Sequence, residues 1–249
     1  MALLETRDLA IAFGGLKALQ GFNIALDTGQ LVGLIGPNGA GKTTVFNLIT
    51  GEYAPSGGVV LLDGLPIQGK RPHEINRLGV ARTFQNIRLF KDLTVFDNLR
   101  VACHARMSQS LLSSVLRTPA YYAHEESIAA RANEILDIFG LGKHATTLAR
   151  NLPYGQQRRL EIARALATQP RLLLLDEPAA GMNPQESHDL MELIRWLREH
   201  FRVGILLIEH DMSVVMNVCE EIHVLDHGTQ IAQGAPAAIR ADRRVIEAY

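Results

Sequence analysis

A glycine-rich segment, residues 36–44, constrains the fold more than any other part of the sequence. Its residues fit the phosphate-binding pattern G-x-x-x-x-G-K-[ST] at every fixed position. The short apolar run 31–35 before it is typical of a buried strand, and Val45, Leu48 and Ile49 after it recur at helical spacing. We therefore predict a strand, a phosphate-binding loop and a helix in succession.

Each kind of residue in this loop suits a bound phosphate. Glycines let the backbone approach closely, so that amide groups and the positive end of the following helix face anionic oxygens. A lysine adds a positive charge for the terminal phosphates, and the hydroxyl of the next residue is placed to hold Mg²⁺. A glycine-rich turn without a ligand is the alternative interpretation, and the complete match argues against it. The loop consists of Gly36, Pro37, Asn38, Gly39, Ala40, Gly41, Lys42, Thr43 and Thr44.

Two carboxylates end a second apolar run. Residues 172–175 are four leucines, and Asp176 and Glu177 follow them. An acid at a strand tip reaches the Mg²⁺ ion held by a phosphate loop. Two acids at a strand end could also be solvated, but in a chain that has a phosphate loop we interpret them as part of the same site. His210 follows the apolar run 203–208 at the edge where parallel sheets bind ligands, although its position alone leaves its role open.

Three further positions are weaker candidates when taken alone. Phe13 lies upstream of the phosphate loop and could stack on a base or simply pack in the core. Gln85 opens a polar stretch after the apolar residues 78–81. Gly155 lies at the start of a predicted helix, where free amide groups can face an anion.

The order of the predicted elements indicates an α/β protein. Residues 3–26 have the pattern of antiparallel strands, and residues 59–62 that of a further strand bounded by turns. Residues 222–232 have the pattern of a final hairpin, followed by a short helix. Residues 94–150 are mainly helical, and Thr94 and Asp97 form a capping pair. We predict one P-loop domain over residues 1–249, with a mainly parallel core and an antiparallel β-subdomain in 1–93 and 151–249, and a helical subdomain in 94–150.

Composition excludes some classes of protein. The chain has 249 residues, 47% of them hydrophobic, which is enough for a large core. Its 25 Lys and Arg residues balance 26 Asp and Glu residues, which argues against a global nucleic-acid-binding surface. Cys103 and Cys219 form no metal-type pair, so we expect a reduced intracellular setting. No signal peptide is expected, and no apolar run approaches the ~20 residues that span a bilayer.

Together, these motifs resemble the ATP-binding subunits of ABC transporters over essentially the whole chain. More narrowly, the sequence resembles the subunits that power uptake of branched-chain amino acids, the LivG type. Four segments carry this narrower resemblance, namely residues 13–16, 81–85, 177–184 and 208–212.

The resemblance implies that the cofactors are ATP and Mg²⁺. Phe13 would stack on adenine, while Lys42 and the loop amides would hold the β- and γ-phosphates. The Mg²⁺ ion would be surrounded by Thr43, Gln85 and Asp176, directly or through water.

The resemblance also implies how ATP is hydrolysed. Glu177 would polarise the attacking water and His210 would contact the γ-phosphate, with Lys42 and Gln85 completing the catalytic set. Gln85 would in addition sense the transmembrane subunit.

The partners implied are a second ATPase subunit, transmembrane permease subunits and, indirectly, an external binding protein. The protein itself would be peripheral, on the cytoplasmic side of the membrane. Two copies would pair head to tail, with Tyr154, Gly155 and Gln156 closing over ATP bound to the other copy. The sequence departs from the family pattern at Pro153 and Tyr154, where a serine and a glycine are usual, and at Asn183, where many relatives have Asp.

Two alternatives remain at this stage. The ATPase of lipopolysaccharide export shares this layout, but residues 179–184 and the insertion around 104–125 favour uptake. An ABC-type ATPase acting on nucleic acid or the ribosome usually has coiled-coil insertions or two ATPase halves. This chain has one phosphate loop and no sustained heptads.

Overall fold

The computed structural model describes residues 2–105 and 117–249, which fall into two compact units. The first unit comprises Met1–Gln85 and Arg171–Tyr249, and the second comprises Asn86–Pro170. The second unit is therefore larger at both ends than the helical subdomain predicted for residues 94–150.

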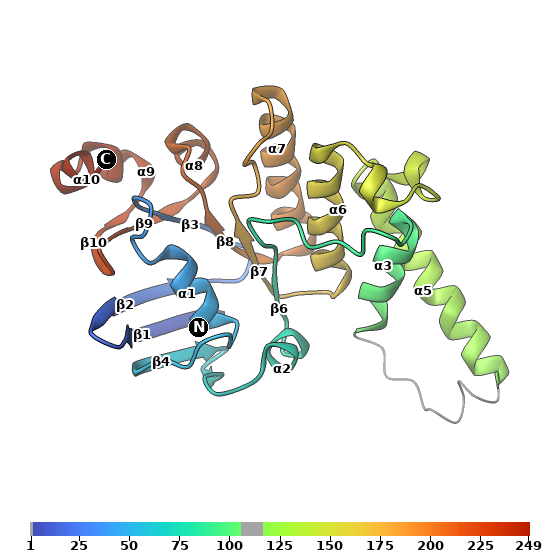
Figure 1. Ribbon diagram of the computed structural model, residues 1–249, viewed down its shortest axis with the longest axis horizontal. Coiled ribbons are helices and arrows are strands. Elements are labelled where there is room, and N and C mark those ends of the chain that lie inside the picture. The colour runs from blue at the N-terminus through green and yellow to red at the C-terminus, as the bar shows by residue number, and fades with distance from the viewer. Residues whose placement is uncertain (1, 106–116) are drawn as a thin grey trace. The chain divides into compact units, whose positions relative to one another are not determined.

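The first unit contains a sheet of ten strands among its described residues (Figure 1). The strands β1, β2 and β4 pair antiparallel, as predicted, and β3, β8, β7 and β6 pair parallel. Their order across the sheet is β5-β4-β1-β2-β10-β9-β3-β8-β7-β6. The strands are β1 (Leu4–Phe13), β2 (Leu16–Leu26), β3 (Leu31–Ile35), β4 (Gly57–Leu62), β5 (Leu65–Pro66), β6 (Val80–Arg82), β7 (Leu172–Asp176), β8 (Gly204–Ile208), β9 (Glu221–Asp226) and β10 (Thr229–Gly234).

The parallel strands bring the predicted site to one edge of the sheet. Every residue of β3, β7 and β8 is buried, as expected for strands covered on both faces. Ile208 pairs with Asp176 on one side and with Leu34 on the other. Because neighbouring parallel strands end at the same edge, the phosphate loop after β3, the acids at the tip of β7 and His210 after β8 lie next to one another.

Six helices accompany the described part of this sheet. They are α1 (Lys42–Ile49), α2 (Pro72–Arg77), α7 (Pro184–Phe201), α8 (Met212–Val218), α9 (Pro236–Ala241) and α10 (Arg243–Ala248). Helix α7 begins with a capping box, in which Asn183 accepts from the Glu186 amide and Glu186 accepts from the Asn183 amide. The single C-terminal helix that we predicted is two short helices, because Asp242 has an extended backbone and caps α10.

The second unit is helical in its described residues. It contains α3 (Val95–His104), α5 (Pro119–Ile138), α6 (Tyr154–Ala167) and the 3-10 turns Gly142–His144 and Ala149–Asn151. The Thr94 hydroxyl accepts from the Asp97 amide, which confirms the predicted cap of α3. Helix α6 packs on α3 and α5, so it belongs to this unit and not to the core to which we assigned residues 151–170. The insertion around residues 104–125 lies in part outside the described residues.

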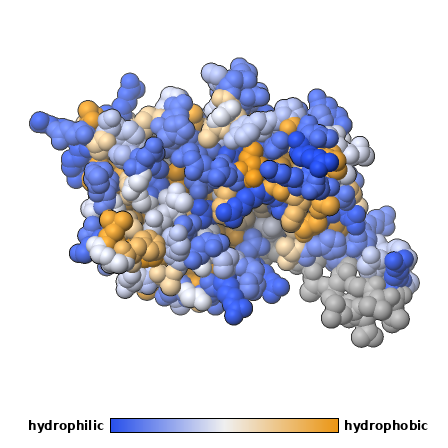
Figure 2. Space-filling model, viewed as in Figure 1, coloured by the Kyte–Doolittle hydropathy of each residue, from blue (hydrophilic) through white to orange (hydrophobic). Residues whose placement is uncertain are grey.

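The apolar side chains are mostly inside. Figure 2 shows hydrophilic residues over much of the visible face, with hydrophobic residues in separate patches. Cys103 and Cys219 are both buried and unpaired. Within residues 2–105 and 117–249, each helix is too short or too polar to cross a membrane.

Candidate active site

The phosphate loop joins β3 to α1 and depends on its glycines. Gly36, Gly39 and Gly41 have φ values of +150°, +81° and +108°. A Cβ atom on Gly36 would lie 2.0 Å from the Leu225 carbonyl oxygen, and one on Gly41 would lie 2.9 Å from the Ala18 carbonyl oxygen. Side chains at positions 36 and 41 would therefore push the loop away from β9 and β2.

Lys42, the first residue of α1, turns back into this loop. Its side-chain nitrogen donates to the carbonyl oxygens of Gly36 at 2.6 Å and Pro37 at 2.9 Å. Burial lowers the pKa of Lys42, and the charges of Glu177 and Asp176 oppose that shift. The lysine charge is thus held close to the loop carbonyls and within the field of the two strand-tip carboxylates.

A cavity of about 400 Å³ lies over the loop. Gln85 and Glu177 line it together with loop residues, and residues 16–18 of β2 and 227–228 of the last hairpin form other parts of its wall. Pockets that bind small molecules have volumes of ~300–1,000 Å³. The pattern of the loop did not indicate residues 16–18 or 227–228, which come from distant parts of the chain.

Asp176 lies at the tip of β7 and is held by an arginine. Its carboxylate is 3.0 Å from Nη2 of Arg82, and the two side chains are only 5% and 6% exposed. Arg82 also donates to Asn47 of α1 at 2.6 Å, and its guanidinium lies over the rings of Phe46 and Phe84. One buried arginine thus joins α1, β6 and β7 beneath the site, a contact that sequence reasoning missed.

Glu177, Gln85 and His210 lie close together, and their roles in hydrolysis remain predictions. The Gln85 amide nitrogen donates to the Glu177 carboxylate at 2.9 Å, and His210 Nδ1 lies 3.9 Å from the same oxygen. Glu177 has a left-handed backbone, with φ +46°, which costs a non-glycine residue roughly 1 kcal/mol. Such strain is concentrated at functional sites.

The predicted magnesium ligands have suitable chemistry. A hydroxyl from Thr43, an amide oxygen from Gln85 and a carboxylate from Asp176 are the hard oxygen donors that Mg²⁺ prefers. Thr43 and Gln85 line the same cavity, and Asp176 ends β7, which is separated from β3 by β8. The residues therefore fit the ion, and their role as ligands remains a prediction.

Phe13 is not among the described residues that line this cavity. It ends β1, is 46% exposed and packs edge-on against Tyr53 with the ring centroids 5.2 Å apart. Its stacking on adenine stays a prediction. The partner ring of Tyr53 was not expected from the sequence.

The residues 154–156 open α6 in the second unit. Pro153 is the N-cap residue, and it offers no side-chain cap. Its carbonyl oxygen accepts from the amides of Gln156 and Gln157, each at 3.0 Å. Tyr154 is 45% exposed. The closure of Tyr154, Gly155 and Gln156 over ATP on another copy remains a prediction.

A phosphate loop that follows a buried parallel strand, with acids on the tip of a nearby strand, defines the class of P-loop nucleoside triphosphatases. The family profile described as "ABC transporter" matches residues 19–180, and one described as "Branched-chain amino acid ATP-binding cassette transporter" matches residues 229–249. The chain belongs to the family of ABC transporter ATP-binding proteins, and it is an ATPase.

Individual relatives agree with this assignment. The chain is 49% identical over 247 residues to the high-affinity branched-chain amino acid transport ATP-binding protein LivG of Escherichia coli K12, covering 99% of this chain and 97% of LivG. It is 33% identical to LptB, the lipopolysaccharide export system ATP-binding protein of the same organism, covering 100% of this chain and 97% of LptB. Among solved structures, the ADP conformation of MJ1267, an ATP-binding cassette of an ABC transporter, matches with a TM-score of 0.87 and 33% identity, covering 100% and 98%.

Proposed function

We propose that this protein is the ATP-hydrolysing subunit of an ABC transporter that takes up branched-chain amino acids. The ATPase activity is supported by one observation above all: Gln85 and His210 both lie within contact distance of Glu177 beside the phosphate loop. The cargo is supported by the relatives, because LivG is named for branched-chain amino acid transport and is far more similar to this chain than LptB is.

Each residue at this edge has a task in phosphoryl transfer, which depends on positioning and on neutralising charge. Lys42 supplies a positive charge for the terminal phosphates. Glu177 orients the attacking water and accepts its proton, and the Gln85 amide holds the Glu177 carboxylate in place. His210 donates toward the γ-phosphate, and a bound Mg²⁺ would neutralise further phosphate charge.

A second copy of the chain completes the proposed site. In this arrangement the free amides at the start of α6, at Tyr154 and Gly155, bind the phosphates of ATP held by the partner subunit. Pro153 provides neither a hydroxyl nor an amide hydrogen for that contact.

Substitution of Pro153 tests this pairing. Pro153→Ser restores the hydroxyl that is usual in the family, so it should increase the fraction of dimer formed in the presence of ATP. Sedimentation velocity with and without ATP measures that fraction, and an unchanged fraction would contradict the proposed contact.

Reconstitution tests the function as a whole. The chain should co-purify with transmembrane permease subunits, and vesicles containing the complex and its external binding protein should accumulate leucine only when ATP is supplied. Vesicles carrying Lys42→Ala provide the matched control. ATP-dependent movement of lipopolysaccharide without leucine uptake would favour the export alternative.

A further inference from the structure

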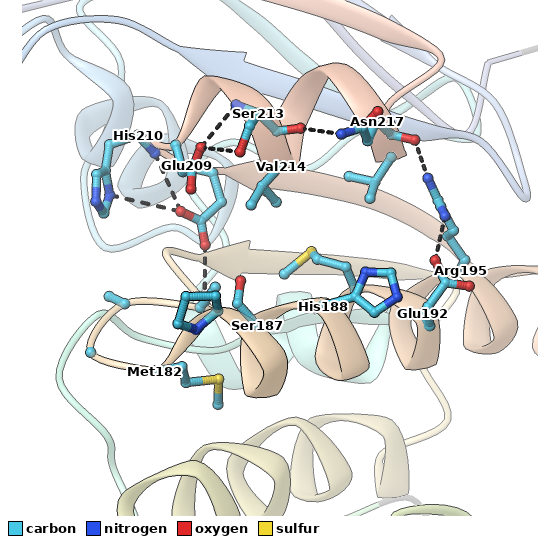
Figure 3. A pocket seen from close by; sticks show the side chains of 17 residues that line it. Met182, Ser187, His188, Glu192, Arg195, Glu209, His210, Ser213, Val214 and Asn217 are labelled. Atoms are coloured by element: carbon cyan, nitrogen blue, oxygen red, sulfur yellow. Dashed lines mark hydrogen bonds and ion pairs between the residues drawn. The ribbon is translucent and has the colours of Figure 1, made fainter.

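A second cavity in the first unit points to a residue to which the sequence assigned no role. It has a volume of about 600 Å³ and lies between α7 and α8 (Figure 3). Its wall includes the turn 179–182 after Glu177 and the segment 209–211 that contains His210. Glu209, the first residue of the second segment, also lines the cavity and is 1% exposed.

The Glu209 carboxylate bonds to both segments. One oxygen accepts from the Ala179 amide at 2.9 Å, and the other accepts from the His210 amide at 3.3 Å. The His210 ring nitrogen Nδ1 lies 3.7 Å from the second oxygen. Figure 3 shows the Glu209 carboxylate beside His210, with its contacts to the backbone and the ring of that residue. A single carboxylate therefore joins the turn after Glu177 to the backbone and the ring of His210.

Burial makes this arrangement costly without its partners. Removal from water raises the pKa of Glu209, and the amides of Ala179 and His210 oppose that shift by stabilising the charged form. A buried amide that loses its acceptor also costs free energy, about 1–3 kcal/mol. The charge and the two amides consequently hold one another in a defined geometry.

The position of this link matters for the chemistry. Ala179 is two residues from Glu177, whose left-handed backbone is held in part by the hydrogen bond that its amide donates to the Ile208 carbonyl oxygen at 2.9 Å. Glu209 follows Ile208 directly. The same short segment of chain therefore anchors the backbone of Glu177, the turn behind it and His210.

We propose that Glu209 is a positioning residue for ATP hydrolysis. It holds His210 and the 179–182 turn in a fixed position relative to Glu177. This inference rests on the roles proposed above for Glu177 and His210. Glu209 acts through these neighbours and has no direct part in the reaction. Its loss should slow the chemical step and leave the binding of ATP almost unchanged.

Two variants of Glu209 separate geometry from charge. Glu209→Gln keeps one oxygen that can accept from the Ala179 amide. Its side-chain NH₂ group then faces the His210 amide, so that two hydrogen-bond donors oppose each other. Glu209→Asp keeps the charge but is one methylene too short to reach both amides. Each should lower kcat by roughly 10- to 100-fold, while KM for ATP stays within about threefold, as expected when geometry in the transition state is lost.

Glu192→Gln is the matched control. Glu192 lies on α7 in the wall of the same cavity and is paired with Arg195, and it contacts neither Ala179 nor His210 through any described bond. The control should keep the kcat of the unsubstituted protein. Thermal unfolding of all variants shows whether each one is folded at the assay temperature. If Glu209→Gln is unfolded there, the kcat of Glu209→Asp tests the inference instead.

A double-mutant cycle with His210→Ala shows whether Glu209 positions His210 or only stabilises the fold in general. If Glu209 acts through His210, Glu209→Gln should slow single-turnover hydrolysis much less in the His210→Ala background than in the unsubstituted protein. If Glu209→Gln slowed hydrolysis by the same factor in both backgrounds, or had the same kcat as Glu192→Gln, the role of Glu209 would be overturned. The proposed function would not be affected by that result. Full activity of His210→Ala would instead overturn the proposed role of His210 and the inference with it.

Discussion

The buried ion pair between Arg82 and Asp176 permits a quantitative prediction about stability. Arg82→Met keeps much of the aliphatic stem that packs on Phe46 and Phe84, but it removes the charge 3.0 Å from the Asp176 carboxylate. Removing one partner of a buried pair costs about 3–5 kcal/mol. Lys42 still contributes a positive charge near Asp176, so we expect the lower end, about 3 kcal/mol.

The predicted change is large enough to measure by thermal unfolding. In a domain of this size about 1 kcal/mol shifts the melting temperature by roughly 2–4 °C, so Arg82→Met should lower it by roughly 6–12 °C. Arg7→Met is the control, because Arg7 forms an exposed pair with Glu5 and should leave the melting temperature unchanged within error.

A cycle with Asp176→Asn identifies the source of the loss. The double variant Arg82→Met, Asp176→Asn leaves no buried charge unpaired, so its destabilisation should be smaller than the sum of the single effects by roughly 1–3 kcal/mol. Strict additivity, or an Arg82→Met protein as stable as Arg7→Met, would refute the reasoning.

Three other predictions follow from the site and the core. Gly36→Ala should abolish ATP binding, because its Cβ would lie 2.0 Å from the Leu225 oxygen. Gly39→Ala has no atom within 4 Å of its Cβ and adds only the backbone strain of its φ of +81°, so it should weaken binding less; equal affinities in a fluorescent-nucleotide titration would contradict this. Burial lowers the pKa of His223 from its ordinary 6.5 to about 4. The unfolded chain therefore takes up a proton first, and stability should fall by about 3 kcal/mol as the pH drops from about 6.5 to about 4. His223→Gln should flatten that part of the pH profile of urea unfolding, and an unaltered profile would disprove the assignment. If Phe13 stacks on adenine, Phe13→Ser should raise KM for ATP at least fivefold with little change in kcat; an unchanged KM would remove Phe13 from the site.

The local parts of the site could be predicted from the sequence. Residues 36–44 specify their own conformation through glycines at fixed spacing, and the leucines before Asp176 are sufficient to indicate a buried strand with an acidic tip. Parallel pairing then places these two segments and His210 at one edge. Each of these inferences depends on residues that are close together in the sequence.

The contacts that support the site could not be predicted in the same way. Arg82 and Asp176 are 94 residues apart, and Ala179 and Glu209 are 30 residues apart. A single arginine or glutamate beside a motif forms no repeating pattern in the sequence. Its partner is therefore seen only when the strands are assembled into the sheet. These long-range bonds set the geometry of the motif residues.

The bounds of the helical unit could not be predicted from the sequence either. Helix α6 follows the loop 139–153 and carries an apolar stripe that would fit either a sheet or other helices. Its packing on α3 and α5, which pattern alone does not specify, assigns it to the second unit.

ATP turnover by Glu177→Gln tests the central claim most directly. The amide keeps the size of the side chain but cannot accept a proton from water, so the variant should bind ATP with nearly the affinity of the unsubstituted protein and hydrolyse it at least 100-fold more slowly. Accumulation of an ATP-bound dimer should accompany that loss. Hydrolysis at the normal rate by this variant would contradict the account.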